Sequence, residues 1–206
     1  MKGLLLVISG PSGVGKGTLV EKLKQARSDM HVSISATTRQ PGPGDVNGVH
    51  YFFKTEEEFV KGIEEGAFLE WAKVFKNYYG TPKATVLAEL EKGKNVILEI
   101  DTAGAMQVKK AYEEAVLIFI APPSKAELRR RIESRGRDTR EQIEHRLSMA
   151  GQEVKMLPNY DYAIVNDDLE KAFADLVKII EAQKFAAHLH HDLVEDFLKG
   201  EEACEC

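Results

Sequence analysis

A glycine-rich segment lies between a short apolar run and the first helical pattern of the chain. Residues 4–9 are typical of a buried strand, and residues 10–18, GPSGVGKGT, follow them directly. The segment fits the pattern G-x-x-x-x-G-K, in which glycines let successive backbone N–H groups turn inward around an anion. Helical spacing begins at Leu19, so a helix N-terminus adds its positive dipole. This order predicts an α/β fold that binds phosphate groups; the alternative is a glycine-rich turn followed by a surface lysine.

The lysine and the residues after it narrow the expected chemistry. Lys16 would place a point charge between the β- and γ-phosphates of a nucleoside triphosphate. The next residue is usually a Ser or Thr that ligates Mg²⁺, but here it is Gly17, with Thr18 one position later. Water and phosphate oxygens would then hold most of the Mg²⁺ coordination shell. The form G-K-G-T resembles that of nucleoside monophosphate kinases.

Further apolar runs alternate with helical patterns along the chain. Residues 31–36 alternate in polarity, while residues 96–100, 116–120 and 162–165 are short and apolar. Helical segments separate these runs, so we expect a parallel sheet covered by helices on both faces. Capping-box patterns of Ser or Thr followed by Glu or Gln mark three helix starts: Thr55 with Glu58, Ser124 with Glu127, and Thr139 with Gln142.

Length and charge exclude several classes of protein. The 206 residues suit one domain, or one core with small inserts. A formal net charge of -5 argues against a generic nucleic-acid coat, which needs a basic surface. Residues 4–8 are far shorter than the ~20 apolar residues that span a bilayer. The two cysteines, Cys204 and Cys206, offer no disulfide framework, so we expect a cytoplasmic protein.

Two segments interrupt the alternation of strands and helices. The segment from about residue 35 to 82 is rich in Gly, Pro and aromatic residues and predicts an insert with its own small sheet. Residues 129–146 contain seven arginines with acidic residues interleaved among them. That cluster indicates either a site for an anionic ligand or a solvated charged helix.

The insert contains candidates for a second ligand. Glu70 lies in an apolar stretch, and an ionised carboxylate only accepts hydrogen bonds. Guanine presents two donors on one edge, whereas adenine has an acceptor at N1, so such a carboxylate favours guanine. Spacing alone favours the alternative, in which Glu70 is a half-exposed strand glutamate.

The chain resembles bacterial and eukaryotic guanylate kinases from residue 5 to about residue 187. Six blocks carry the resemblance in order: residues 10–18, 33–53 (SISATTRQPGPGDVNGVHYFF), 68–82 (FLEWAKVFKNYYGTP), 97–105 (ILEIDTAGA), 121–139 (APPSKAELRRRIESRGRDT) and 164–169 (IVNDDL). The resemblance implies a P-loop NTPase core of residues 1–34, 84–128 and 147–187, a small mixed GMP-binding insert of residues 35–83, and a helical lid of residues 129–146. Residues 188–206 lie outside it, and their helical spacing predicts an amphipathic tail.

The resemblance also implies a role for each matching residue. The ATP-binding residues would be Gly10, Pro11, Ser12, Gly13, Val14, Gly15, Lys16, Gly17 and Thr18, with Asn166 and Asp167 near the adenine. The GMP-binding residues would be Ser35, Arg39, Tyr51, Glu70, Tyr79, Thr81, Glu99 and Asp101. The catalytic cations would be Lys16, Arg39, Arg131, Arg135 and Arg146. The implied reaction converts GMP to GDP with Mg²⁺ and ATP. We expect dGMP to be accepted as well, because none of the residues named above reads the 2′-hydroxyl.

Some positions depart from the family pattern. Gly42 replaces an arginine of the motif T-T-R-x-P-R, so we expect weaker GMP binding. The motif Ile-Asp-x-Gln-Gly has lost its glutamine at Ala103, and Glu99 stands where many relatives have Asp. The alternative functions are a non-catalytic interaction module, a kinase for another monophosphate, and a nucleic-acid-binding protein. The expected partners are ATP and GMP, with neither nucleic acid nor membrane, and a homo-oligomer is left open.

Overall fold

The computed structural model describes residues 2–134, 136, 138–189 and 197–199, and its main sheet is parallel throughout. The strand order is β2-β7-β1-β8-β9. These strands are β1 (Leu5–Ser9), β2 (Met30–Val32), β7 (Asn95–Glu99), β8 (Val116–Ala121) and β9 (Tyr162–Val165). The glycine-rich loop of residues 10–18 follows the carboxyl end of β1, the central strand of this sheet.

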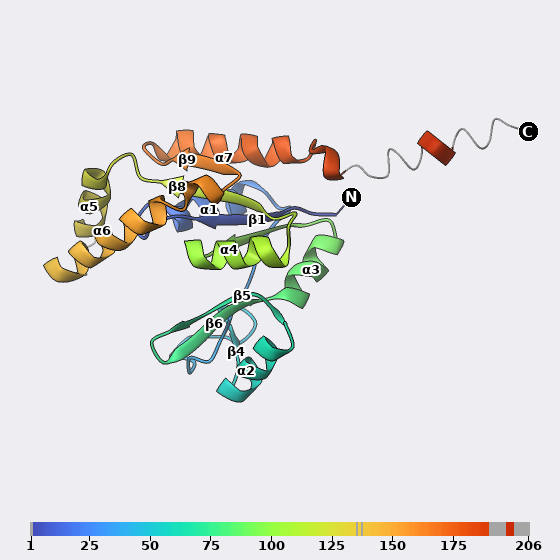
Figure 1. Ribbon diagram of the computed structural model, residues 1–206, viewed down its shortest axis with the longest axis horizontal. Coiled ribbons are helices and arrows are strands. Elements are labelled where there is room, and N and C mark those ends of the chain that lie inside the picture. Colours follow the sequence, from blue (N-terminus) through green and yellow to red (C-terminus); the bar gives the residue numbers. More distant parts are fainter. Residues whose placement is uncertain (1, 135, 137, 190–196, 200–206) are drawn as a thin grey trace, which may run out of the picture.

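Helices cover both faces of the main sheet (Figure 1). They are α1 (Lys16–Ala26), α3 (Lys83–Glu91), α4 (Thr102–Ala111) and α7 (Leu169–Gln183). Leu6 and Ile8 of β1 pack on the side of α1 and α7, while Leu5 and Val7 pack on the side of α3 and α4. A strand buried on both faces reads as a continuous apolar run, which is the pattern of residues 4–8. The predicted α/β fold with a doubly covered parallel sheet is confirmed.

A second, mixed sheet is formed by strands that lie between residues 36 and 82. Its order is β4-β3-β6-β5, with β3 (Ala36–Thr37), β4 (Phe52–Phe53), β5 (Phe68–Val74) and β6 (Asn77–Pro82). Helix α2 (Glu56–Glu64) packs on it through the buried Phe59, whose ring stacks on Phe68 with centroids 4.3 Å apart. In Figure 1 this sheet and α2 hang below α4 and α3.

The expected single strand over residues 31–36 is wrong. β2 ends at Val32 and pairs with β7 in the main sheet, while β3 begins at Ala36 and pairs with β6 in the second sheet. Alternating polarity reports that a segment is half-buried, but it carries no information about its pairing partner. Residues 33–35 are therefore where the chain passes from one sheet to the other.

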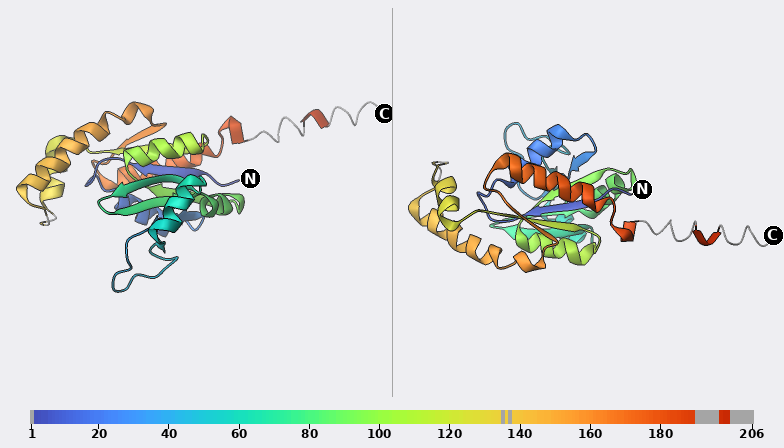
Figure 2. Two further views of the ribbon diagram at one scale, coloured as in Figure 1. Left: turned by 60° about the horizontal axis from the view of Figure 1, so that its bottom comes forward. Right: turned by 90° about the horizontal axis from the view of Figure 1, so that it is seen from above.

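Helices α5 (Lys125–Glu133) and α6 (Arg140–Val154) project together from one end of the molecule (Figure 2). Two short 3₁₀ turns, η1 (Leu157–Asn159) and η2 (Ala187–Leu189), complete the described elements. Two of the three predicted capping boxes are complete, at Thr55 and Thr139. At the start of α5, Ser124 accepts from the Glu127 N–H, but the Glu127 carboxylate binds Arg130 and Arg131 instead of the cap backbone.

The carboxyl-terminal tail and membrane-spanning helices are also subjects of prediction from the sequence. The predicted tail helix over residues 188–206 lies largely outside the described residues, as do Cys204 and Cys206. Within the described part of the chain, no helix is both long enough and apolar enough to span a bilayer.

Candidate active site

The glycine-rich loop is shaped by residues that adopt backbone conformations other side chains avoid. Gly10, Gly13 and Gly15 have φ angles of 136°, 94° and 96°. A Cβ on Gly10 would lie 2.2 Å from the Ile120 carbonyl oxygen of β8, so this position also lacks space for a side chain. Val14 is fully buried and anchors the loop to the core. Glycine at these positions therefore permits the shape of the loop, and packing against the core fixes it.

Lys16 begins α1 and turns back over the loop. Its ammonium donates to the carbonyl oxygens of Gly10 at 2.5 Å and Pro11 at 3.2 Å. A hollow of about 480 Å³ opens beside it, lined by Gly10, Ser12, Gly13, Gly15, Lys16, Gly17, Thr18, Glu99, Ile100, Asp101 and Glu153. A cation at the rim of a glycine-lined hollow at a helix N-terminus is suited to bind phosphate oxygens.

Three carboxylates face the same hollow, and one of them has an unusual titration. Burial raises the pKa of the Glu153 carboxyl above its ordinary value, while the charge of Lys16 opposes that shift. Asp101 caps α4 by accepting from the Gly104 N–H at 2.7 Å. Glu99 borders Gly17: an ideal Cβ on that glycine would lie 3.5 Å from one Glu99 oxygen.

The carboxyl-terminal part of the chain meets the loop through Asn166 and Arg146. Asn166 is buried and donates to the Val14 carbonyl oxygen at 2.7 Å. Arg146 of α6 donates to the Ser12 hydroxyl at 3.1 Å and pairs with Asp138 at 3.2 Å. Arg131 of α5 reaches the Asp167 carbonyl oxygen at 3.4 Å, next to Asn166, so of the two arginines Arg146 alone has a hydrogen bond to the loop among the described residues.

Both interpretations of the arginine cluster find support. Arg129 pairs with Glu133 and Glu144, and Arg130 pairs with Glu127, as expected of a solvated charged helix. Arg131 and Arg146 also have acidic partners, Glu127 and Asp138, but Arg146 reaches Ser12 of the loop and Arg131 reaches the Asp167 carbonyl oxygen. Hydrogen bonds to Arg130 and Arg131 lower the pKa of Glu127 to about 2. Arg135 lies outside the described residues.

A second hollow lies between the two sheets, beside the first. It measures about 200 Å³ and is lined by Val32, Ser33, Ser35, His50, Tyr51, Thr81, Leu98, Glu99 and Ile100. Of the predicted GMP-binding residues, Ser35, Tyr51, Thr81 and Glu99 therefore surround one space. Glu99 and Ile100 also line the hollow at Lys16, so the two spaces adjoin at the carboxyl end of β7.

Glu70 is nearly buried and is held by a neighbouring strand. The Thr81 hydroxyl donates to Glu70 Oε1 at 2.6 Å. Burial raises the pKa of Glu70, the Thr81 hydrogen bond opposes the shift, and the charge of Asp101 adds to it. The structure therefore differs from the alternative of a half-exposed strand glutamate, since only 8% of Glu70 is exposed.

Arg39 forms a separate cluster with aromatic rings of the second sheet. Its guanidinium lies 5.4 Å from the Tyr51 ring centroid, and the Tyr51 and Tyr79 rings meet edge to face at 6.1 Å. Asp45 pairs with Arg39 at 2.8 Å and also accepts from the Gly42 N–H at 2.7 Å. Arg39 lines neither of the two hollows.

Sequence reasoning missed Glu153 and Asp45. Glu153 lies seven positions after Arg146, two turns along the same helix, so it shares the face of α6 that meets the loop. That spacing is readable from the sequence, but only once α6 is known to continue past residue 146. Asp45 carried no signal, because its pairing with Arg39 depends on how the intervening loop folds.

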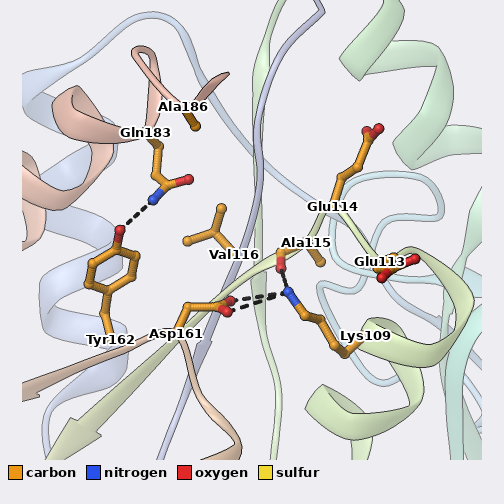
Figure 3. Close-up of a pocket in the computed structure, with 9 residues that line it drawn as sticks. All are labelled: Lys109, Glu113, Glu114, Ala115, Val116, Asp161, Tyr162, Gln183 and Ala186. Carbon is orange, nitrogen blue, oxygen red and sulfur yellow. Dashed lines mark hydrogen bonds and ion pairs between the residues drawn. The ribbon is translucent and has the colours of Figure 1, made fainter. Parts of the chain in front are cut away.

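A hollow larger than the two at Lys16 and between the sheets, about 670 Å³, lies away from them both. Figure 3 shows it at the amino ends of β8 and β9, where Lys109 donates to the Ala115 carbonyl oxygen at 2.8 Å and pairs with Asp161. The glycine-rich loop follows the carboxyl end of β1, which is parallel to β8. The two places are therefore at opposite ends of the strands.

Comparisons with known proteins assign the chain to a family. The family model described as guanylate kinase matches residues 2–183. The chain is 52% identical to a guanylate kinase of Caldanaerobacter subterraneus over 93% of both chains, and 46% identical to one of Clostridioides difficile over 97% of this chain and 98% of the other. The crystal structure of guanylate kinase from Anaplasma phagocytophilum matches with a TM-score of 0.68 and 34% identity, covering 89% of this chain and 87% of that one. The chain belongs to the guanylate kinase family.

Proposed function

We propose that the protein transfers the γ-phosphoryl group of ATP to a phosphate oxygen of GMP, giving ADP and GDP, and that it also accepts dGMP. One observation carries the proposal: the hollow at Lys16 and the hollow at Ser35, Tyr51 and Thr81 adjoin at Glu99 and Ile100. A phosphate donor in the first and a phosphate acceptor in the second would have their reacting ends near each other. Membership of the guanylate kinase family supports the same pair of substrates.

ATP would bind at the glycine-rich loop. The backbone N–H groups of residues 10–18 would hold its phosphates, and Lys16 would leave its carbonyl partners to bind the β- and γ-oxygens. Asn166 and Asp167 would lie at the adenine, beyond the outer side of the loop. Arg146, which donates to the Ser12 hydroxyl of the loop, and Arg131 would neutralise charge on the transferred group, with Arg135 as a third cation.

GMP would bind between the sheets. Glu70 and Asp101 would accept from the guanine edge, with Ser35 and Thr81 adding hydroxyl contacts. Arg39, Tyr51 and Tyr79, which cluster on the second sheet, would hold the GMP phosphate. Because Asp45 occupies the Arg39 guanidinium, GMP would compete with that carboxylate for it.

The chemistry needs positive charge more than a general base. A phosphate monoester oxygen is already anionic near neutral pH, because its second pKa is ~6. The barrier is repulsion between two anions, which Lys16, Arg39 and the lid arginines would reduce. Closure of residues 35–83 and 129–146 over the nucleotides would exclude water and prevent ATP hydrolysis. Gly136, with a φ of 61°, would act as a flexible point.

The donor set at the loop fits Mg²⁺ bound together with ATP. The described residues contain no group of three or more His, Cys, Asp or Glu that could hold a metal by themselves. Gly17 supplies no hydroxyl, and the Glu99 carboxylate borders the place where one would stand. Glu99 and Asp101 would therefore bind the ion through its water molecules, and the ion would supply neutralisation of phosphate charge.

The test is ADP formation from Mg-ATP with each of GMP, dGMP, AMP, CMP and UMP. We expect turnover with the two guanine nucleotides, and none with a Lys16→Ala variant whose circular dichroism matches the wild type. Near-normal turnover of that folded variant would refute the proposal. Absence of turnover with every acceptor, from protein that binds ATP, would support a non-catalytic interaction module. A cytoplasmic location stays a prediction.

A further inference from the structure

The side-chain amide of Gln107 joins helix α4 to the backbone of strand β5. Gln107 Oε1 accepts from the Trp71 backbone N–H at 3.1 Å, and Gln107 Nε2 donates to the Trp71 carbonyl oxygen at 3.1 Å. The amide thus occupies both hydrogen-bonding groups of one residue, as a neighbouring strand would. β5 is the edge strand of the second sheet, so these groups face away from β6.

The clamped residue is next to Glu70. Trp71 follows the carboxylate directly, and the pairing of β5 with β6 changes register between Phe68 and Glu70. A register shift leaves the strand locally irregular, so the ladder to β6 alone fixes this stretch less firmly. The two hydrogen bonds from Gln107 supply a second anchor immediately after the irregularity.

The same helix holds the other predicted guanine ligand. Asp101 is the N-cap of α4, and Gly104 and Gln107 follow at three-residue intervals along one side. Gly104 leaves room for Glu70: an ideal Cβ there would lie 3.2 Å from Glu70 Oε2. Helix α4 therefore meets Glu70 at Gly104 and its neighbour Trp71 at Gln107.

We propose that Gln107 is a positioning residue for base recognition, which sets the placement of Glu70 relative to Asp101 by fixing β5 to α4. The inference rests on the proposed function, because it takes Glu70 and Asp101 as the guanine ligands. One carboxylate belongs to the second sheet and the other to the main domain, so their separation depends on the contact between β5 and α4. Gln107 makes that contact specific at the residue beside Glu70.

The experiment compares Gln107→Met with the wild type and with Lys110→Met. The methionine keeps the length of the side chain and removes both hydrogen bonds. Lys110 lies three positions later on α4 and lines the same shallow groove beside Trp71, so it is a matched control. The assays are steady-state kinetics with GMP, IMP and ATP, and titration of GMP binding by the fluorescence of Trp71, the single tryptophan.

We expect Gln107→Met to raise the KM and the Kd for GMP about tenfold and to leave the KM for ATP unchanged. The preference for GMP over IMP should fall, because IMP lacks the amino group that a well-placed Glu70 would bind. Lys110→Met should match the wild type. A Gln107→Met variant that only melts at a lower temperature, with an unchanged ratio of GMP to IMP, would overturn the proposal.

Two further measurements cover the cases in which Gln107→Met does not fold or the proposed function is wrong. If Gln107→Met does not fold, amide exchange of the wild type decides: slow exchange at the Trp71 N–H supports the clamp, and exchange at the rate of an unprotected amide overturns it. Wild-type protein that neither binds nor phosphorylates GMP would refute the proposed function. Wild-type protein that phosphorylates GMP, together with an unaltered variant, would refute the role of Gln107 alone.

Discussion

Replacing Glu70 by glutamine separates recognition of guanine from stability. The amide has the shape of the carboxylate, so Thr81 can still donate to Oε1, as it does at 2.6 Å. The second oxygen becomes an NH₂ group, which donates. Guanine presents two donors, N1–H and N2–H₂, so one favourable contact with the base would become a clash of two donors.

The expected loss of activity follows from the hydrogen bond to guanine that the variant loses. A hydrogen bond to a charged group is worth ~1.5–3 kcal/mol, so Glu70→Gln should cost about 3 kcal/mol of GMP binding, or roughly 10²-fold in kcat/KM. Because the contact is made in the bound substrate and in the transition state alike, the loss should fall on KM. An amide matches the adenine edge, so activity with AMP should rise relative to GMP.

The expected effect on stability has the opposite sign. Burial raises the pKa of Glu70 above its ordinary value of 4.5. The folded protein therefore binds a proton more tightly than the unfolded chain, and stability falls as the pH rises from 4.5 through the raised pKa. The variant has no proton to lose there. Glu70→Gln should match the wild type at low pH and exceed it above that range.

The assays are initial rates with GMP and AMP and thermal unfolding between pH 4 and pH 8. Asp101→Asn offers a comparison, since it removes the charge of the other predicted guanine ligand. A Glu70→Gln variant with wild-type KM for GMP would refute the recognition argument. A variant less stable than the wild type at pH 8 would refute the argument from burial.

Three further predictions follow from named contacts. An ideal Cβ on Gly42 lies 3.6 Å from Arg39 Nη1, so a Gly42→Arg side chain would stand beside Arg39. One added charge-assisted hydrogen bond to the GMP phosphate, ~1.5–3 kcal/mol, should lower the KM for GMP about tenfold. An unchanged KM would contradict this prediction. Arg146 reaches the loop at Ser12, so Arg146→Gln should lower kcat about 10²-fold in rapid-quench or steady-state assays. Arg130 pairs with Glu127, so Arg130→Gln should leave kcat unchanged. Equal losses in the two variants would contradict a role in transfer for Arg146 and not for Arg130. The pKa of Glu127 is about 2 in the folded protein, so the stabilising effect of its carboxylate is present above pH 4.5 and lost as the pH falls toward 2. The difference in melting temperature between wild type and Glu127→Gln should therefore shrink over that interval. A constant difference would exclude the ion pairs of Glu127 as the source of that difference.

The elements of the main sheet could be predicted because each depends on its own residues. Strands buried on both faces require continuous apolar runs, and the runs at residues 96–100 and 116–120 became such strands. The run at residues 162–165 became the edge strand β9, which is only partly buried. Helix caps at Thr55 and Thr139 likewise depend on two residues three positions apart. The segment 31–36 failed because the choice between two sheets depends on β7 and β6, which lie far away in the chain.

The sequence by itself determined the glycine-rich loop, since its conformation is set by consecutive residues. Gly10, Gly13 and Gly15 adopt positive φ angles that only glycine takes readily, and Lys16 follows them in the chain. Only the tertiary structure decided what surrounds that loop and its neighbouring hollow. The contacts of Arg39 with Asp45 and of Gln107 with the Trp71 backbone, and the position of Glu153 at the hollow beside Lys16, depend on the packing of separate elements. No local pattern encodes such distances, because they are set by the whole core.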